Sequence, residues 1–233
     1  MPGWRAVGFD LDDTLYPERQ FVLSGFEAVA EWLQGETDLP ADRALRELDD
    51  LFGAGVRGDT FDRFLMIHGL PIGSYRQRMV EIYRKHMPKL TPYADVIPTL
   101  TRLRRRYRVG LATEGPAKVQ HRKLDALGVR GLFHSVVILG EGDRARWKPD
   151  AWPLEKLAGG LGVPPAEMVY VGDNPGKDFL AARRAGMSSL RIRRPDGLHR
   201  AEEPAGPEDA PDGEVADLTG LETWLERRGA HGS

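Results

Sequence analysis

Residues 6–14 read Ala-Val-Gly-Phe-Asp-Leu-Asp-Asp-Thr, a short apolar run that ends abruptly in a cluster of acids. The run at residues 6–9 is typical of a buried strand, and continuous apolar runs of this kind occur in parallel sheets that are covered on both faces. Ligands of open parallel sheets bind beyond the carboxyl ends of the strands. The acids that follow Phe9 are therefore the first candidates for a functional site.

The rest of the chain supplies the remainder of a parallel sheet. From about residue 92 onward, helical stretches alternate with short apolar runs at 109–112, 136–139, 168–171 and 189–192, which indicates βαβ units. Between about Glu18 and Met87, apolar residues recur at helical spacing and Gly and Pro separate the stretches, so we expect about four helices. Residues 195–213 are expected to form a loop, and the amphipathic stretch from Leu218 a helix. The sequence predicts an α/β core at 1–16 and 92–233, interrupted by an all-helical domain at 17–91.

Composition excludes several classes of protein. The 233 residues contain no cysteine, which removes disulfide scaffolds, thiolate catalysis and Cys-ligated metal centres. With 33 Lys and Arg against 35 Asp and Glu, the net charge of −2 argues against a nucleic-acid or anionic-membrane surface. No apolar run approaches the roughly 18 residues of a membrane span, and acids stand where a signal peptide needs its apolar segment. We expect a cytoplasmic protein that binds neither nucleic acid nor membrane.

The strand ends gather groups that favour phosphoryl transfer. Asp10 and Asp12 are separated by one residue, so an extended chain would direct both side chains to the same side. Converging carboxylates repel unless a cation holds them, and Mg²⁺ suits such oxygen ligands. Thr113 and the amides of Thr113-Glu114-Gly115, where a helix begins, are candidate phosphate ligands. Lys148 adds a cation, and this combination is typical of phosphoryl-transfer sites.

Four motifs in this order resemble those of the haloacid dehalogenase superfamily, in its phosphatase branch. They are Asp10-Leu11-Asp12-Asp13-Thr14, Thr113, Lys148-Pro149 and Gly172-Asp173-Asn174-Pro175-Gly176-Lys177-Asp178. The resemblance covers residues 5–192, and the helical insertion is similar to that superfamily's cap after the first strand. It implies a Rossmann-like parallel sheet core flanked by helices, with an inserted all-helical cap. It also implies Mg²⁺-dependent hydrolysis of a small phosphorylated metabolite. We expect the protein to be a monomer or homodimer.

The resemblance implies a role for each residue that carries it. Asp10 would be the nucleophile that forms an aspartyl-phosphate, and Asp12 the general acid and then the base. Mg²⁺ would be held by the Asp10 carboxylate, the Asp12 backbone carbonyl and Asp173. Thr113 and Lys148 would hold the phosphoryl oxygens.

Other positions near the motifs have supporting or open roles. Asp178 would orient Lys148 or the water shell of the metal, and Asn174 would orient Asp173 or cap the next helix. Glu114 stands where many relatives carry Asn, and its carboxylate would oppose an anion unless a cation such as Lys118 paired with it. Three further interpretations concern single residues: Asp13 as a loop or capping residue, Gly172 as a tight-turn glycine, and Arg57 in the Gly55–Gly58 turn as a substrate ligand or an ordinary solvated arginine.

Two other functions remain open. A carbon–halogen hydrolase of the same superfamily is disfavoured by Asp12, because a halide leaving group needs no proton. A phosphate-accepting regulatory module without turnover also gathers acids after its first strand. The helical insertion and the Gly172-Asp173 motif argue against that module.

Overall fold

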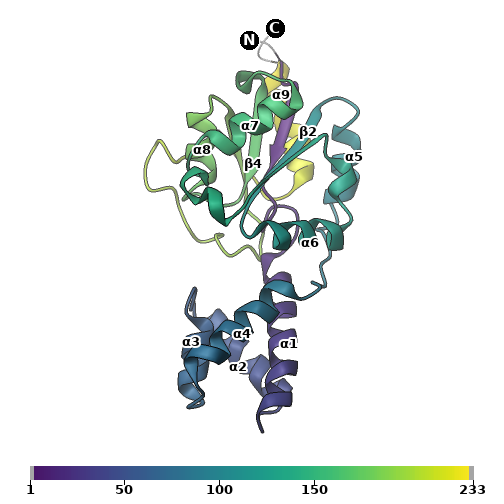
Figure 1. The fold of residues 1–233 in the computed structure, drawn as a ribbon. Helices are drawn as coiled ribbons and strands as arrows, with labels where there is room; N and C mark the ends of the chain where they lie inside the picture. Colours follow the sequence, from purple (N-terminus) through teal and green to yellow (C-terminus); the bar gives the residue numbers. More distant parts are fainter. Residues whose placement is uncertain (1–2, 231–233) are drawn as a thin grey trace. The chain divides into compact units, whose positions relative to one another are not determined.

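The computed structural model describes residues 3–230, and its contacts divide the chain into two compact units (Figure 1). The core unit holds the residues up to Glu18 and from Thr91 onward, and the helical unit holds Arg19–Leu90. Residues 1–2 and 231–233, at the two ends of the expected core, lie outside the described residues.

The core unit is built on a six-stranded sheet in which all neighbours are parallel, in the order β3-β2-β1-β4-β5-β6. The strands are β1 (Ala6–Phe9), β2 (Arg108–Glu114), β3 (Ser135–Leu139), β4 (Met168–Gly172), β5 (Ser188–Ile192) and β6 (Glu214–Val215). The expected parallel α/β fold is therefore confirmed. β6 was not expected, because two residues are too few to show a strand period.

Helices cover both faces of this sheet, as expected from its connections. They are α5 (Val96–Leu103), α6 (Ala117–Leu127), α7 (Trp152–Leu161), α8 (Asp178–Arg184) and α9 (Leu218–Ala230), with short 3₁₀ turns η1 (Arg130–Leu132), η2 (Glu141–Arg146) and η3 (Pro165–Glu167). The connections β2-α6-β3 and β3-α7-β4 run across the sheet in opposite directions. Because such crossovers are right-handed, α6 and α7 must lie on opposite faces. Figure 1 shows α7 and α8 on one side of the sheet and α5 and α6 on the other.

The face under α7 is closely packed because two central strands carry glycine there. Leu157 of α7 is fully buried. A Cβ atom added at Gly8 would lie 2.9 Å from Leu157 Cδ2, and one added at Gly110 would lie 2.7 Å from Leu157 Cδ1. The missing side chains thus leave the space that Leu157 fills against β1 and β2.

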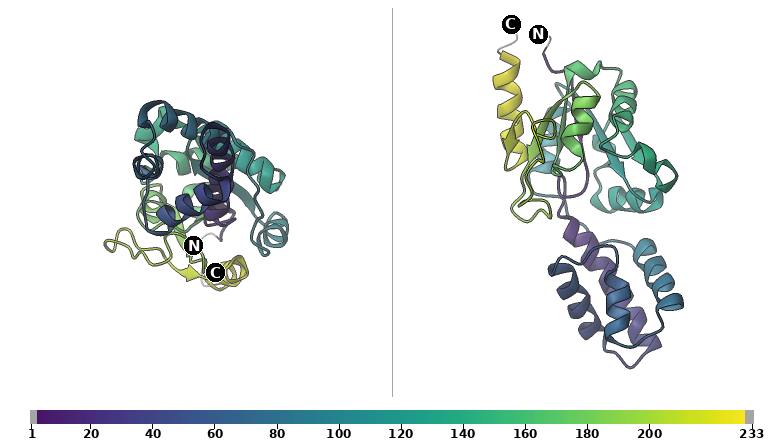
Figure 2. Two further views of the ribbon diagram at one scale, coloured as in Figure 1. Left: turned by 90° about the horizontal axis from the view of Figure 1, so that it is seen from below. Right: turned by 90° about the vertical axis from the view of Figure 1, so that its left-hand side faces the viewer.

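The helical unit consists of α1 (Glu18–Glu36), α2 (Ala41–Gly53), α3 (Thr60–Ile67) and α4 (Ile72–Lys85), packed around one another (Figure 2, right). Its described residues contain no strand, in agreement with the expected helical block. Each helix turns apolar side chains inward, and Phe26, Leu48, Phe64 and Met79 are all buried. This unit therefore has its own core.

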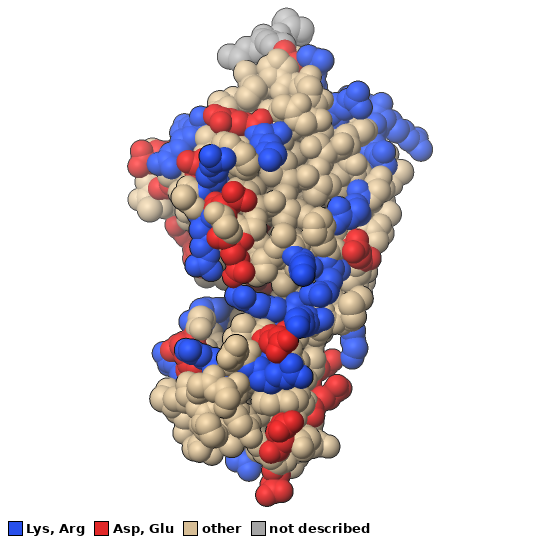
Figure 3. Space-filling model, viewed as in Figure 1, with Lys and Arg blue, Asp and Glu red and all other residues tan. Residues whose placement is uncertain are grey.

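The surface agrees with the composition. On the face drawn in Figure 3, basic and acidic side chains are interspersed with uncharged residues, as a net charge of −2 allows. Within the described part of the chain, no helix combines the length and apolarity needed to cross a membrane.

The packing of α7 gives a test of the core. We expect Leu157→Ala to lower the free energy of unfolding by about 2–5 kcal/mol, because it removes a fully buried side chain and leaves a cavity over two glycines. Urea denaturation measures this change. The control Glu155→Ala, at an exposed position of the same helix, is expected to cost less than about 1 kcal/mol. Equal losses in the two variants would contradict the packing described.

Candidate active site

Three expected site residues lie at the carboxyl ends of the three central strands. Asp10 directly follows β1, Asp173 directly follows β4, and Thr113 is the penultimate residue of β2. The N–H of Asp10 donates to the carbonyl of Val171 at 2.9 Å, which keeps the ends of β1 and β4 level. The sheet itself therefore brings these side chains to one edge.

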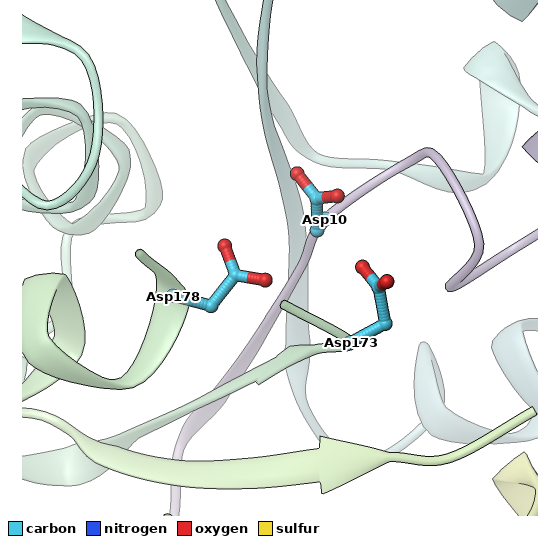
Figure 4. A group of neighbouring side chains, drawn as sticks. All are labelled: Asp10, Asp173 and Asp178. Atoms are coloured by element: carbon cyan, nitrogen blue, oxygen red, sulfur yellow. The ribbon is translucent and has the colours of Figure 1, made fainter. Parts of the chain in front are cut away.

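Asp10, Asp173 and Asp178 form a cluster of buried carboxylates. One oxygen of each lies within 4.8 Å of those of the other two, and Figure 4 shows the three side chains directed toward one another. Asp173 Oδ2 is buried and has no hydrogen-bond partner among the described residues. Burial, together with the charges of Asp178 and Asp10, holds the pKa of Asp173 well above its usual range. A buried carboxyl oxygen without a hydrogen-bond partner, beside two further carboxylates, fits a hard divalent cation as its ligand.

The ammonium group of Lys148 lies among these acids and uses all three of its N–H donors. Nζ donates to Asp10 Oδ1 and to Asp178 Oδ1, each at 2.7 Å, and to the Tyr170 hydroxyl at 2.9 Å. Burial acts to lower the pKa of Lys148, but the charges of Asp10 and Asp178 outweigh it and hold that pKa well above its usual value. Lys148 therefore stays cationic. Its expected contact with phosphoryl oxygens remains a prediction and would require one partner to be exchanged.

Asp178 uses both carboxylate oxygens to hold its neighbours. Oδ1 accepts from Lys148, and Oδ2 accepts the N–H of Asn174 at 3.0 Å. Burial acts to raise the pKa of Asp178, but Lys148 and Lys177 lower it overall. Asp178 thus contacts Lys148 directly, and its role in orienting Lys148 or the water shell of a metal stays a prediction.

The residues around Asp178 differ from the sequence interpretation. Gly172 is not a left-handed turn residue, since its φ is not positive. It provides space instead, because a Cβ atom there would lie 2.4 Å from Asp178 Oδ2. Asn174 neither contacts Asp173 nor caps α8: its Oδ1 accepts the N–H of Gly176 at 2.9 Å, and its Nδ2 lies 2.9 Å from His199 Nε2.

The loop after β2 also departs from expectation. β2 continues to Glu114, so the N–H of Gly115 donates to the carbonyl of Leu139 at 3.0 Å. The prediction of a free Gly115 amide for phosphate is therefore wrong. Glycine is still favoured at this position by its φ of 139°.

Glu114 is directed toward lysines of the core. Oε1 accepts the backbone N–H of Lys148, and Oε2 lies 3.9 Å from Lys177 Nζ, so Lys177 rather than Lys118 is its cationic partner. Burial raises the pKa of Glu114, while Lys148 and Lys177 act in the opposite direction. A contact of Glu114 with substrate stays a prediction.

The side chain of Asp12 does not join the acid cluster of the described residues. Its Oδ1 accepts from Lys123 Nζ at 2.7 Å and from the hydroxyl of Tyr16. Burial acts to raise the pKa of Asp12, but Lys123 and Tyr16 lower it overall. The expected convergence of the Asp10 and Asp12 carboxylates on one point is therefore wrong. The chain bends after Asp10 and pairs Asp12 with Tyr16.

Asp13 and Arg57 have local contacts. The two oxygens of Asp13 accept the N–H groups of Glu18 and Leu198, each at 2.8 Å, as expected of a loop residue. Within the helical unit, the Arg57 guanidinium donates to the carbonyls of Phe52 and Val56 at 2.6 and 2.9 Å. The role of Arg57 as a substrate ligand stays a prediction.

Sequence reasoning missed several buried polar residues at this site. Gln120 Nε2 donates to Thr113 Oγ1, and Lys123 lies one turn further along α6. Both are buried. A signal was available, because Lys123 lies four residues from Val119 and from Leu127 and so occupies the apolar stripe of its helix.

Tyr16, Tyr170 and Lys177 were missed as well, and only Tyr170 offered a hint, as a hydroxyl within an apolar strand.

The fold and the site define a class of enzyme in which acids and a lysine gather beyond the carboxyl ends of parallel strands. The family model described as haloacid dehalogenase-like hydrolase matches residues 7–192. The chain therefore belongs to the haloacid dehalogenase-like hydrolases, as its four motifs predicted.

Known proteins of this family resemble the chain over nearly its whole length. A glyceraldehyde 3-phosphate phosphatase of Methanopyrus kandleri is 36% identical over 91% of this chain and 92% of its own. A phosphoserine phosphatase of Thermus thermophilus is 33% identical over 93% of this chain and 75% of its own. The crystal structure of a HAD phosphatase from Thermococcus onnurineus has a TM-score of 0.63 at 29% identity, covering 95% and 97% of the two chains. The chain is thus a phosphatase-like hydrolase.

The contact between Gly172 and Asp178 gives a test of the site. We expect Gly172→Ala to lower the free energy of unfolding by about 1–3 kcal/mol, because its Cβ atom would displace the Asp178 carboxylate that holds Lys148. The matched control is Gly159→Ala in α7, where nothing lies within 4 Å of the added atom. That control is expected to stabilise the protein by about 0.5–1 kcal/mol. Chemical denaturation of both variants checks the difference, and a stable Gly172→Ala would contradict the contact.

Proposed function

We propose that the chain is a Mg²⁺-dependent phosphatase that hydrolyses a small phosphate monoester through an aspartyl-phosphate at Asp10. The observation that carries this proposal is the buried Asp10 carboxylate held by Lys148 beside the unpartnered oxygen of Asp173. Lys148 occupies Asp10 Oδ1, and no described residue donates to Asp10 Oδ2. Oδ2 is therefore the oxygen left to attack phosphorus.

The residues present fit the divalent cation that this reaction requires. The carboxylates of Asp10 and Asp173 and the backbone carbonyl of Asp12 would hold it. The buried, unpartnered Oδ2 of Asp173 supports this assignment. When bound, Mg²⁺ supplies positive charge that offsets the phosphoryl group and the neighbouring acids.

The remaining chemistry is assigned to side chains of the chain. Asp10 Oδ2 forms a bond to phosphorus while the bond to the leaving oxygen breaks, and protonated Asp12 gives its proton to that oxygen. In the second step Asp12 takes a proton from water, whose oxygen attacks phosphorus as the bond to Asp10 breaks. The products are an alcohol and inorganic phosphate. Because Thr113 Oγ1 accepts from Gln120, its own hydroxyl proton remains to donate to a phosphoryl oxygen.

The relatives favour a short phosphorylated metabolite as the substrate. Glyceraldehyde 3-phosphate is the first candidate, because the Methanopyrus kandleri phosphatase named for it is 36% identical over 92% of its length. Phosphoserine is the next candidate, since the Thermus thermophilus phosphatase named for it is 33% identical over 75% of its length.

A screen of phosphorylated metabolites, with and without Mg²⁺ and ranked by kcat/KM, tests this function. We expect Mg²⁺-dependent release of inorganic phosphate, with triose phosphates among the best substrates. Asp10→Asn should lower kcat at least about a thousandfold, because it removes the nucleophile. The control Asp143→Asn changes an exposed acid of η2 and should leave activity unchanged.

Three outcomes would contradict the proposal. Halide release from a 2-haloacid without metal would favour a carbon–halogen hydrolase. A phospho-aspartate that persists for minutes without turnover would favour a regulatory module. Full activity of Asp10→Asn would show that Asp10 is not the nucleophile.

Thermal unfolding tests the cation site separately from activity. We expect Mg²⁺ at about 100 times its Kd to add about 2.7 kcal/mol of stability, or about 5–10 °C in Tm for a chain of this size. Asp173→Asn should abolish this shift and raise the Tm of the metal-free protein at neutral pH, because burial and the charges of Asp178 and Asp10 oppose ionisation of Asp173 in the folded state and so cost stability there. An Mg²⁺ shift of equal size in both proteins would contradict the assignment.

A further inference from the structure

Lys123 is a buried lysine that the reaction assigned above does not use directly. It projects from α6 in the core unit, and its Nζ lies 2.7 Å from Asp12 Oδ1. The hydroxyl of Tyr16 donates to the same oxygen. Two donors from different segments of the chain therefore meet on one oxygen of this carboxylate.

This arrangement leaves the second oxygen of Asp12 available. No described residue donates to Asp12 Oδ2. A carboxylate whose Oδ1 is held at two points cannot rotate freely about its side-chain bonds, so the direction of Oδ2 is fixed as well. Proton transfer requires the reacting atoms within hydrogen-bond reach of each other, and such alignment is worth a large part of the rate.

We propose that Lys123 is a positioning residue for proton transfer: with Tyr16 it holds Asp12 Oδ1, so that Oδ2 gives the proton to the leaving oxygen and later takes one from water. This inference rests on the proposed phosphatase function and adds the residue that sets the geometry of its acid and base. Lys123 acts through Asp12 and does not touch the reacting atoms.

The position of Lys123 on its helix supports this role. Val119 and Leu127, four residues away on either side, are buried on the same stripe of α6. An apolar residue at position 123 would fit that stripe, whereas burial of an ammonium group costs several kcal/mol unless it is paired. The fold of α6 therefore does not require a charge at this position, and the contact with Asp12 gives the buried ammonium group a charged partner.

α6 supports a second side chain of the site in the same way. Gln120, one turn before Lys123, is buried and donates to Thr113 Oγ1. Residues three apart on a helix lie on one face. One face of α6 thus holds both the Thr113 hydroxyl, near the end of β2, and the Asp12 carboxylate, beyond the end of β1.

Other charged groups near Asp12 act only through space. Asp10, Asp13 and Glu18 add negative charge around it, and Lys177 adds positive charge. Among the described residues, Lys123 is the cation in direct contact with the Asp12 carboxylate. Its removal should therefore free the side chain rather than merely change the local charge.

The test compares Lys123→Met, Asp12→Asn and the double variant on two substrates, an alkyl phosphate and an activated aryl phosphate. Asp12→Asn should lower the alkyl rate at least a hundredfold, as expected for loss of a general acid. Lys123→Met should lower single-turnover phosphoryl transfer from the alkyl phosphate at least tenfold, and from the aryl phosphate less than threefold. In the Asp12→Asn background, Lys123→Met should cost nothing further, because Lys123 acts through Asp12.

Two controls separate this role from a general loss of structure. Lys118→Met removes an exposed lysine from the same helix and should leave both rates unchanged. Tyr16→Phe removes the other donor from Oδ1 and should also lower the alkyl rate more than the aryl rate. Equal losses on both substrates, or losses that multiply in the double variant, would overturn the proposal.

A readout without activity keeps this inference distinct from the proposed function. In crystal structures, the Asp12 carboxylate should leave its place beside Tyr16 in Lys123→Met and keep it in Lys118→Met. An unchanged Asp12 in Lys123→Met would overturn the positioning role. Absence of phosphatase turnover in the wild-type protein would instead refute the proposed function, and the position of Asp12 would still decide whether Lys123 holds it.

Discussion

The contacts of the Lys148 ammonium with Asp10 and Asp178, each 2.7 Å long, join parts of the chain that are 138 and 30 residues apart. Burial of any one of these charges alone would cost several kcal/mol. The three groups must therefore come together when the core folds. This requires β1 and β4 to be neighbours, as the strand order provides, and it requires Gly172, because any side chain there would occupy the place of Asp178.

The same arrangement leaves one carboxyl of the cluster without a cation in direct contact. Lys148 compensates Asp10 and Asp178, whereas Asp173 has an oxygen that is buried and unpartnered among the described residues. A second lysine in contact with Asp173 would balance the charge of its carboxylate without a bound cation. No lysine contacts Asp173 among the described residues. A cation bound there would lie close to Asp10 as well, because the carboxylates of the two residues are neighbours. The lack of a cationic contact at Asp173 is thus the feature on which the proposed use of Mg²⁺ depends.

Much of the fold could be predicted because its signals are local. Five strands and the helical block follow from apolar periodicity, and Asp10 and Asp173 follow from the rule that ligands bind beyond parallel strands. The wrong predictions concern where strands end and which side chains contact one another, and the apolar periodicity of a sequence carries no information on either. β2 extends to Glu114 because β3 pairs with it to Leu139, which removes the Gly115 amide from the site. The contact of Lys123 with Asp12 was missed because it joins residues 111 positions apart, and that of Tyr16 because it depends on the bend of the chain after Asp10.

The divergence of Asp10 and Asp12 shows why such contacts decide the chemistry. An extended chain would have brought both carboxylates to one side, where each would oppose ionisation of the other. Instead the chain bends, so that Lys148 donates to Asp10 and Lys123 donates to Asp12. The pKa of Asp10 is raised, by burial above all, while contact with Lys123 and Tyr16 lowers that of Asp12 despite burial. Two carboxylates separated by one residue are thereby given different partners, and the proposed roles of nucleophile and proton carrier fall to side chains that are held by different lysines.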